Sequence, residues 1–228
     1  MNRVYTLVTC LLLLLMQPGC ASSRKIIELD SLLPKKQAKF KKYKTVKSTL
    51  DHYFTKEAYR AIKGIPLIKG PAINGYVAGV NFWSNLVSFL SLNGTGRKVI
   101  IPEEMLANQG LPSIVHEYVH HLDDMDRDGE GDWIDHDEFL KAYKLMSIDM
   151  KWKGIALWSE RLANSWITNT FGIGPMSEQI AYISQNIARG IGPDYMKHVY
   201  RKMLKTRYAK TVYVVTIYGK KITLHLED

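Results

Sequence analysis

One stretch decides the fold that we predict for this 228-residue chain: Ser113-Ile-Val-His116-Glu117-Tyr-Val-His120-His-Leu122. Its apolar residues recur at helical spacing and Pro112 suits a first helical turn, so we predict a helix over residues 112–122. Residues four apart lie on one face of a helix, which brings the imidazoles of His116 and His120 together. Most neighbouring residues are apolar, so we expect this helix to be buried.

A buried helix with two histidines and a glutamate needs a reason, because unpaired polar groups in an apolar interior are costly. The pattern His-Glu-x-x-His supplies one. His116 and His120 can bind one zinc ion, and Glu117 lies beside them, where it can serve as a general base. The alternative is a pair of hydrogen-bonded core histidines. His121 faces another way and is not an expected ligand.

This motif is followed by an acidic, glycine-containing loop and by an aromatic helix with Phe139 and Tyr143. Together they resemble the zinc metallopeptidases whose third ligand is a downstream glutamate (gluzincins), in particular the anthrax lethal factor catalytic domain and the glucose-regulated bacterial metallopeptidases. The resemblance covers about residues 97–190. It implies a zincin-like fold and hydrolysis of a protein or peptide substrate by a metal-activated water, with Glu117 as general base.

The family pattern places the third zinc ligand in a Glu-x-x-Ala sequence on a later helix, and two glutamates fit it. We favour Glu160, because its helix face carries alanines and is expected to be buried. Glu178, whose face looks wetter, is the alternate third ligand. The family also has a tyrosine about seven residues before the ligand glutamate, and neither position here has one. The groups that could replace it are Tyr182, Tyr195 and His198.

The fold class that we predict is α+β, mainly helical in the C-terminal half. Glycine and proline clusters separate helices expected at 136–150, 156–169, 177–189 and 194–205. Residues 97–102 predict a strand in a small sheet packed on the histidine helix, and as an exposed edge it could pair with an extended substrate. The alternating tail, residues 211–226, predicts a β-hairpin.

Residues 123–137 predict an acidic loop in which eight of fifteen residues are acidic. Five of them, with Gly129, have the spacing of an EF-hand calcium loop: Asp124, Asp126, Asp128, Asp132 and Asp135. Their mutual repulsion also favours a cation, which makes calcium a second candidate cofactor, although we favour a solvated acidic loop, because the twelfth position holds Asp in place of the longer Glu.

The first nineteen residues predict an export signal. Arg3 precedes an apolar run too short to span a bilayer, and the sequence around Cys20 resembles a bacterial lipoprotein signal. We expect Cys20 to be lipidated, against simple secretion or a retained anchor. This places the protein in the cell envelope, on the periplasmic side of the outer membrane where the cell has one.

Residues 20–63 predict a basic arm, since seven of the thirteen residues 35–47 are lysines. We favour a solvated tether or helix face for these lysines, and contact with anionic lipid headgroups next to the anchor is the functional alternative. Nucleic acid is not an expected partner of an exported protein. Residues 64–228 would then form the peptidase domain.

The composition, 46% apolar and 23% charged, excludes a disordered chain and a polytopic membrane protein. The function that we expect is a zinc-dependent peptidase anchored to the cell envelope. Two others stay open: a catalytically silent, metal-stabilised binding lipoprotein, and a calcium-dependent adhesion or assembly module.

Overall fold

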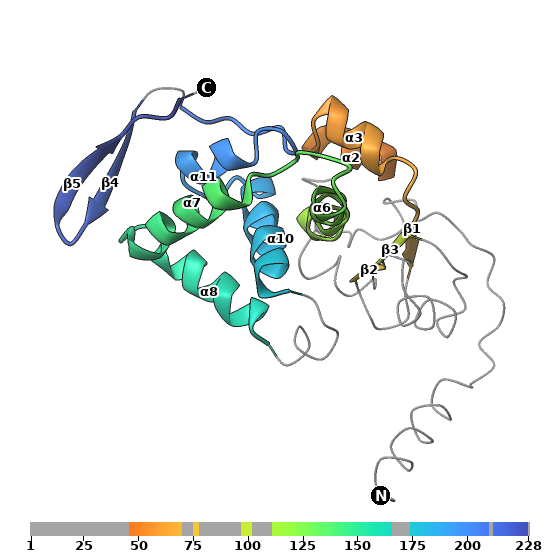
Figure 1. The fold of residues 1–228 in the computed structure, drawn as a ribbon, viewed down its shortest axis with the longest axis horizontal. Helices are drawn as coiled ribbons and strands as arrows, with labels where there is room; N and C mark the ends of the chain where they lie inside the picture. The colour runs from red at the N-terminus through yellow and green to blue at the C-terminus, as the bar shows by residue number, and fades with distance from the viewer. Residues whose placement is uncertain are drawn as a thin grey trace, which may run out of the picture.

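The computed structural model describes residues 46–69, 75–77, 97–101, 111–165, 174–209 and 212–227. Its elements are α2 (Val46–Tyr53), α3 (Lys56–Ile62), β1 (Leu67–Lys69), β2 (Gly75–Val77), β3 (Lys98–Ile101), α6 (Pro112–Arg127), α7 (His136–Ile148), α8 (Lys153–Ala163), α10 (Pro175–Ala188), α11 (Asp194–Val199), β4 (Tyr213–Ile217) and β5 (Lys220–Leu224) (Figure 1). The protein is mainly helical with a small C-terminal antiparallel hairpin, as predicted. The expected signal, Cys20 and the lysines of 35–44 lie outside the described residues.

Helix α6 carries the histidine motif and lies at the centre of the core. Every residue from Pro112 to Asp123 is buried, and α3 and α10 both contact the helix. The helix ends at Arg127, five residues later than predicted, so the first part of the expected acidic loop is helical. The ion pair between Arg127 and Asp123, one turn apart and 2.7 Å long, offsets part of the acidic repulsion there.

A three-stranded sheet of order β1-β3-β2 lies against α6, which contacts both β2 and β3. Strand β3 is parallel to β1 and antiparallel to β2, and its four residues are buried. The prediction of an exposed edge strand at 97–102 is therefore wrong. Both sides of β3 already carry a partner strand, so an extended peptide has no free edge there.

Helices α2 and α3 come from the segment 46–63, which the sequence assigned to the basic arm. Phe54, Ala58 and Ile62 have no exposed surface and belong to the core. Backbone hydrogen bonds also tie this segment to the C-terminal part of the chain: the amide of Thr55 donates to the carbonyl of Met203. This part of the arm is thus folded into the domain.

The C-terminal helices build the other half of the core, where α8 contacts α7 and α10, and α11 contacts α7. Asp135 caps α7 by accepting from the backbone amide of Glu138. The hairpin of β4 and β5 is attached near the α7–α8 turn, because Trp152 donates to the hydroxyl of Tyr213 and Val215 is buried. None of the helices in the described segments combines the length and apolar character needed to cross a membrane.

Candidate metal centre

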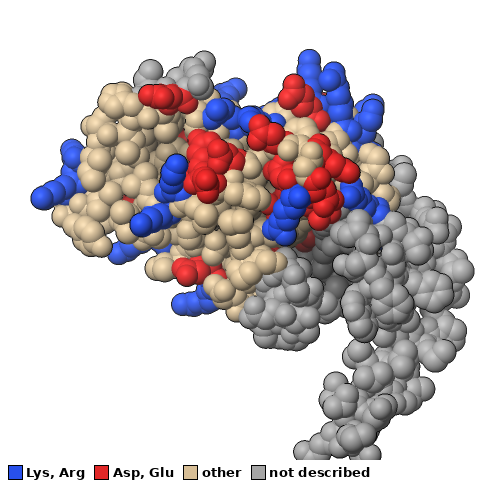
Figure 2. Space-filling model, viewed as in Figure 1, with Lys and Arg blue, Asp and Glu red and all other residues tan. Residues whose placement is uncertain are grey.

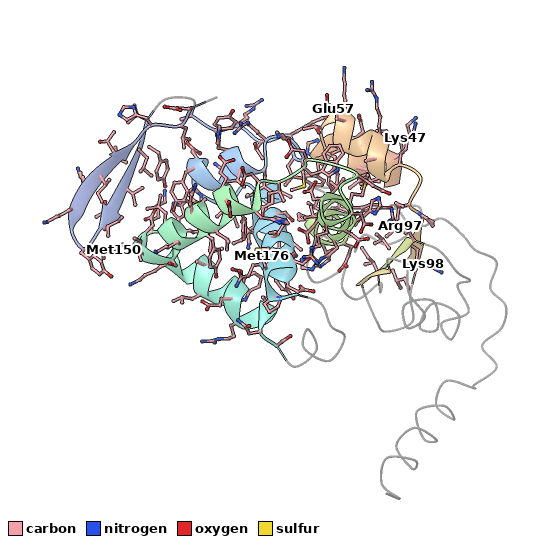
Figure 3. The ribbon with its side chains drawn as sticks, viewed as in Figure 1. Lys47, Glu57, Arg97, Lys98, Met150 and Met176 are labelled. Atoms are coloured by element: carbon pink, nitrogen blue, oxygen red, sulfur yellow. The ribbon has the colours of Figure 1, made fainter. Side chains whose placement is uncertain are left out.

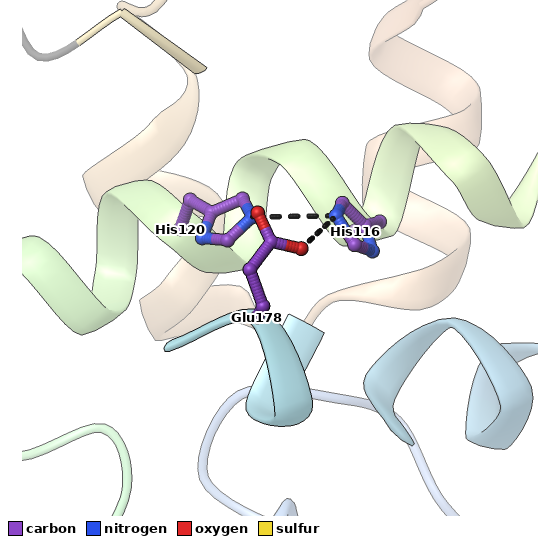
Figure 4. A group of neighbouring side chains, drawn as sticks. All are labelled: His116, His120 and Glu178. Atoms are coloured by element: carbon purple, nitrogen blue, oxygen red, sulfur yellow. Dashed lines mark hydrogen bonds and ion pairs between the residues drawn. The ribbon is translucent and has the colours of Figure 1, made fainter. Parts of the chain in front are cut away.

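Three buried side chains from α6 and α10 meet in the core (Figure 4). His116 and His120 lie one turn apart on α6, with their Nε2 atoms 3.3 Å apart. Glu178 lies in the first turn of α10. Its Oε2 atom is 3.5 Å from Nε2 of His116, and its Oε1 atom is 3.5 Å from Nε2 of His120. None of the three residues exposes more than 8% of its surface. Two imidazoles and a carboxylate thus face one another away from solvent.

The structure brings Glu178, and not Glu160, to the histidines. Helix α8 turns Ala156, Ser159 and Ala163 toward the core, and this leaves Glu160 exposed. The prediction that the side chain of Glu160 is buried is wrong, because its neighbour Ser159 takes the inward position. On α10 the buried face includes Glu178 itself, and this helix packs directly on α6.

Charges within the group set its protonation. Burial lowers the pKa of His116, but the carboxylates of Glu117 and Glu178 outweigh this effect and raise it above its ordinary value. Burial and the charge of His116 lower the pKa of His120 to about 4. Burial raises the pKa of Glu178, but the two histidines outweigh it, and the net shift is downward. At neutral pH Glu178 is therefore ionised, and His120 is neutral and keeps a lone pair.

A hydrogen-bonded chain behind His120 orients its ring. The hydroxyl of Ser177 donates to Asp123 at 2.6 Å, so its oxygen is available to accept from Nδ1 of His120 at 3.2 Å. That arrangement places the ring proton on Nδ1 and leaves Nε2 as the lone-pair atom facing Glu178. Asp123 is 1% exposed and also accepts from Arg127 and His136. Ser177 has no sequence signal, because it lies 57 positions from His120.

Glu117 and Tyr182 adjoin the three donors. Glu117 is 2% exposed, and its charge contributes to the raised pKa of both His116 and Tyr182. Tyr182 lies one turn after Glu178, and its ring meets that of His116 edge-on at 4.5 Å. Burial, with the charges of Glu178 and Glu117, raises the pKa of Tyr182 to about 12. Its phenol therefore stays protonated and can donate a hydrogen bond.

Tyr195 and His198, the other two groups that could replace the tyrosine of the family pattern, have partners elsewhere. Tyr195 donates to Asp149 at 3.2 Å. His198 pairs with Glu138 at 3.5 Å and stacks edge-on with Tyr208. Of the three candidates, only Tyr182 contacts a member of the group formed by His116, His120 and Glu178.

The donor set fits zinc. Imidazole nitrogens and a carboxylate oxygen are usual zinc ligands, and atoms held at about 2.1 Å from a tetrahedral ion lie about 3.4 Å apart. The two Nε2 atoms, 3.3 Å apart, agree with this value, and Glu178 has a different carboxylate oxygen 3.5 Å from each of them. One donor atom from each of the three residues lies within 4.8 Å of the other two. The three side chains can therefore close on one ion with little movement of the helices.

Four of the five aspartates in the expected calcium loop have separate partners. Asp126 accepts from the backbone amides of Trp133 and Ile134, at 2.7 and 3.0 Å. Asp128 pairs with Arg97, Asp132 with Lys202, and Asp135 caps α7. Asp124 and Asp126 lie inside α6, so the loop begins only at Asp128. Within the described segments, the only cluster suited to a metal is that of the two histidines and Glu178.

Comparisons with protein-family models, curated proteins and solved structures returned no match for this chain. The features in common with the gluzincin pattern are therefore local ones. They are the His-Glu-x-x-His sequence on a buried helix and, on a second helix, Glu178 followed three residues later by Ala181. His121 is buried outside the group, as predicted, where its surroundings include Arg97 and the backbone of Ala61.

Proposed function

We propose that the protein is a zinc-dependent peptidase of zincin-like architecture. The observation that carries this proposal is the meeting of His116, His120 and Glu178 in the core, with Glu117 beside them. A structural zinc site is usually closed by four protein ligands, whereas these three donors leave a position open for water. A buried carboxylate next to that set is the additional group that a hydrolase requires.

Each residue has a separate role in this proposal. His116, His120 and Glu178 would hold the ion, which when bound polarises a carbonyl and lowers the pKa of water. Glu117 accepts the proton of the attacking water and passes it to the leaving amine. Tyr182 donates its phenol proton in a hydrogen bond to the carbonyl oxygen as negative charge develops there.

The proposed location is the cell envelope. Lipidation at Cys20 and contact of the 20–45 segment with anionic headgroups would hold the peptidase near a membrane, where its substrate is a protein or peptide. Incorporation of a radiolabelled fatty acid, lost in Cys20→Ser, tests the anchor. A wild-type protein without label would contradict lipidation.

Metal content tests the donor set. Wild-type protein should contain one zinc per chain by mass spectrometry, and Glu178→Gln should lose it. Glu160→Gln is the matched control, because this glutamate also precedes an alanine by three positions but is exposed. Its zinc content should equal that of the wild type. Absence of zinc from the wild type after reconstitution, or retention in Glu178→Gln, would overturn the site.

The carboxylate at position 117 separates the enzyme from a silent binding protein. Glu117→Gln should keep its zinc and lose cleavage of an unstructured protein substrate by at least about a hundredfold. In the silent alternative, His116, His120 and Glu178 bind the ion and no peptide is cleaved. Wild-type protein that holds zinc but cleaves no peptide in a broad library would favour that alternative.

A further inference from the structure

The turn of the C-terminal hairpin holds a tyrosine in an unfavourable backbone conformation. Tyr218 has φ 48° and Gly219 has φ 79°, so both central residues of the turn lie in the left-handed region. Asn-Gly is the usual pair there, and a bulky residue at the first position is uncommon. The side chain of Tyr218 is 87% exposed, so it contributes little to the core. Its presence there calls for a reason outside folding.

Other apolar side chains surround this tyrosine at the surface. A hollow of about 560 Å³ lies between the hairpin turn and the α7–α8 turn, lined by Ser147, Ile148, Met150, Lys153, Tyr218 and Gly219. Met150 is 58% exposed and Ile148 is 38% exposed. Figure 3 shows Met150 at the hairpin end of the molecule, and its backbone amide donates to the carbonyl of Thr216 at 3.4 Å. The apolar side chains are thus held together by the fold.

Exposed lysines are close in sequence to the residues of this apolar surface, and one of them, Lys153, lines the hollow. The neighbouring exposed lysines are Lys144, Lys151, Lys153, Lys220 and Lys221. Between residues 139 and 159 the only acidic residue is Asp149, which is 3% exposed and bonded to Tyr195 and to the amide of Lys151. Figure 2 shows lysine and arginine atoms at the rim of this end, with the larger acidic groups farther along the molecule.

We propose that this hairpin face, defined by Ile148, Met150, Tyr218 and the five lysines around them, docks on the surface of an anionic lipid bilayer. A tyrosine suits the level of the headgroups, because its ring is apolar and its hydroxyl is wet. Lysines extend around it to lipid phosphates, while their aliphatic stems cover apolar surface. The proposal does not depend on the metal centre. The hairpin face also lies far in sequence from the basic N-terminal segment.

Amine acetylation on vesicles tests the contact with the full chain. Lys220 and Lys221 should lose about tenfold in reactivity, measured by mass spectrometry, on vesicles of phosphatidylcholine mixed with phosphatidylglycerol. Lys220 and Lys221 should keep their reactivity on vesicles of phosphatidylcholine alone, even where the N-terminus holds the chain to the vesicle. Unchanged reactivity on the anionic vesicles, or a chain that binds no vesicle, would overturn the proposal.

A pair of single variants separates docking from other causes of protection. Tyr218→Ser should restore most of the reactivity of Lys220 and Lys221 on anionic vesicles. Ile191→Ser is the matched control, because Ile191 is 40% exposed but lies in the turn after α10, and it should keep the protection. Protection that arises without vesicles at high protein concentration would identify a protein partner, such as a second copy, and would refute lipid docking.

Discussion

Ser177 connects the candidate metal centre to the buried carboxylate of Asp123. Its hydroxyl donates to Asp123, and its oxygen lies 3.2 Å from Nδ1 of His120. Metal-binding histidines depend on such a partner, since it sets which ring nitrogen holds the proton and how the ring is turned. One serine on α10 therefore influences a ligand on α6.

Removal of this hydroxyl should weaken zinc binding. We expect Ser177→Ala to lower zinc affinity by about 10- to 100-fold in competition with a chelator, because the ring of His120 loses its orienting partner. The matched control is Ser184→Ala, on the same helix, where a buried hydroxyl bonds only the carbonyl of Ala181 in its own helix. Equal affinities in the two variants would contradict a role for Ser177.

His121 gives the metal-free protein a pH-dependent stability. Burial, and then the charge of Arg97, lowers the pKa of His121 to about 4 in the folded state, against about 6.5 when unfolded. Between these values the unfolded chain binds a proton that the folded chain does not, so the free energy of unfolding falls as pH falls. Above about pH 6.5 both states are neutral and the contribution is complete.

The measurement is denaturant unfolding of metal-free protein at about pH 7 and about pH 4.5. The loss of stability should be smaller in His121→Gln than in wild type, by on the order of 1–2 kcal/mol. His120, whose pKa is also lowered to about 4, remains in both proteins and so cancels from the comparison. An identical pH dependence in the two proteins would show that His121 titrates normally in the folded state.

At the scale of elements, the packing of α10 on α6 decides where the glutamate lies. Ala181 has no exposed surface on α10, one turn after Glu178. A small side chain there lets the two helices approach closely enough for the carboxylate to reach both histidines. The hydroxyl of Tyr200 also holds α10 by donating to the carbonyl of Ile180 at 2.6 Å.

A larger side chain at this contact should harm both stability and the site. Ala181→Leu should cost about 1–3 kcal/mol of unfolding free energy through overpacking and should reduce zinc content. Ala188→Leu, at a half-buried position at the end of the same helix, is the control and should change zinc content little. Thermal unfolding and metal analysis of both variants measure the two effects. Full zinc occupancy in Ala181→Leu would argue against the close approach.

At the scale of the whole molecule, the segment between α2 and α3 and the segment after α11 hold each other in place. Phe54 forms a β-bridge with Leu204, and the amide of Lys205 donates to the carbonyl of Tyr53. Phe54 is also fully buried against the ring of Tyr118 on α6. Residues of α2 and α3 thus share one core with the predicted peptidase domain, residues 64–228. We expect that domain to depend on them for its stability.

Truncation tests this dependence. A chain that starts at residue 64 should fail to unfold cooperatively, whereas one that starts at residue 44 should give a sharp transition by circular dichroism. As a point variant, Phe54→Ala should cost about 3–5 kcal/mol, because it leaves a cavity in the core. Exposed Lys56→Ala, in α3, should change stability by less than about 0.5 kcal/mol. Cooperative unfolding of residues 64–228 alone would support the predicted boundary at residue 64 and contradict this dependence.

The helical segments and the histidine pair could be predicted because their signals are local. The spacing of His116 and His120, Pro112 at a helix start, and the alternation around Gly219 each act within a few residues. The end of α6 could not be predicted in this way, because Asp123 also accepts from Ser177 and His136, which are distant in sequence.

The sequence by itself determined the two histidines, the adjoining Glu117, the predominance of helices and the C-terminal hairpin. Only the tertiary structure decided between Glu160 and Glu178, brought Tyr182 to His116, placed β3 inside its sheet and gave the acidic loop its separate partners. The physical reason is that each of these depends on which helix or strand face meets a partner distant in sequence. Glu160 and Glu178 have the same local pattern, and only the packing of α10 on α6 distinguishes them.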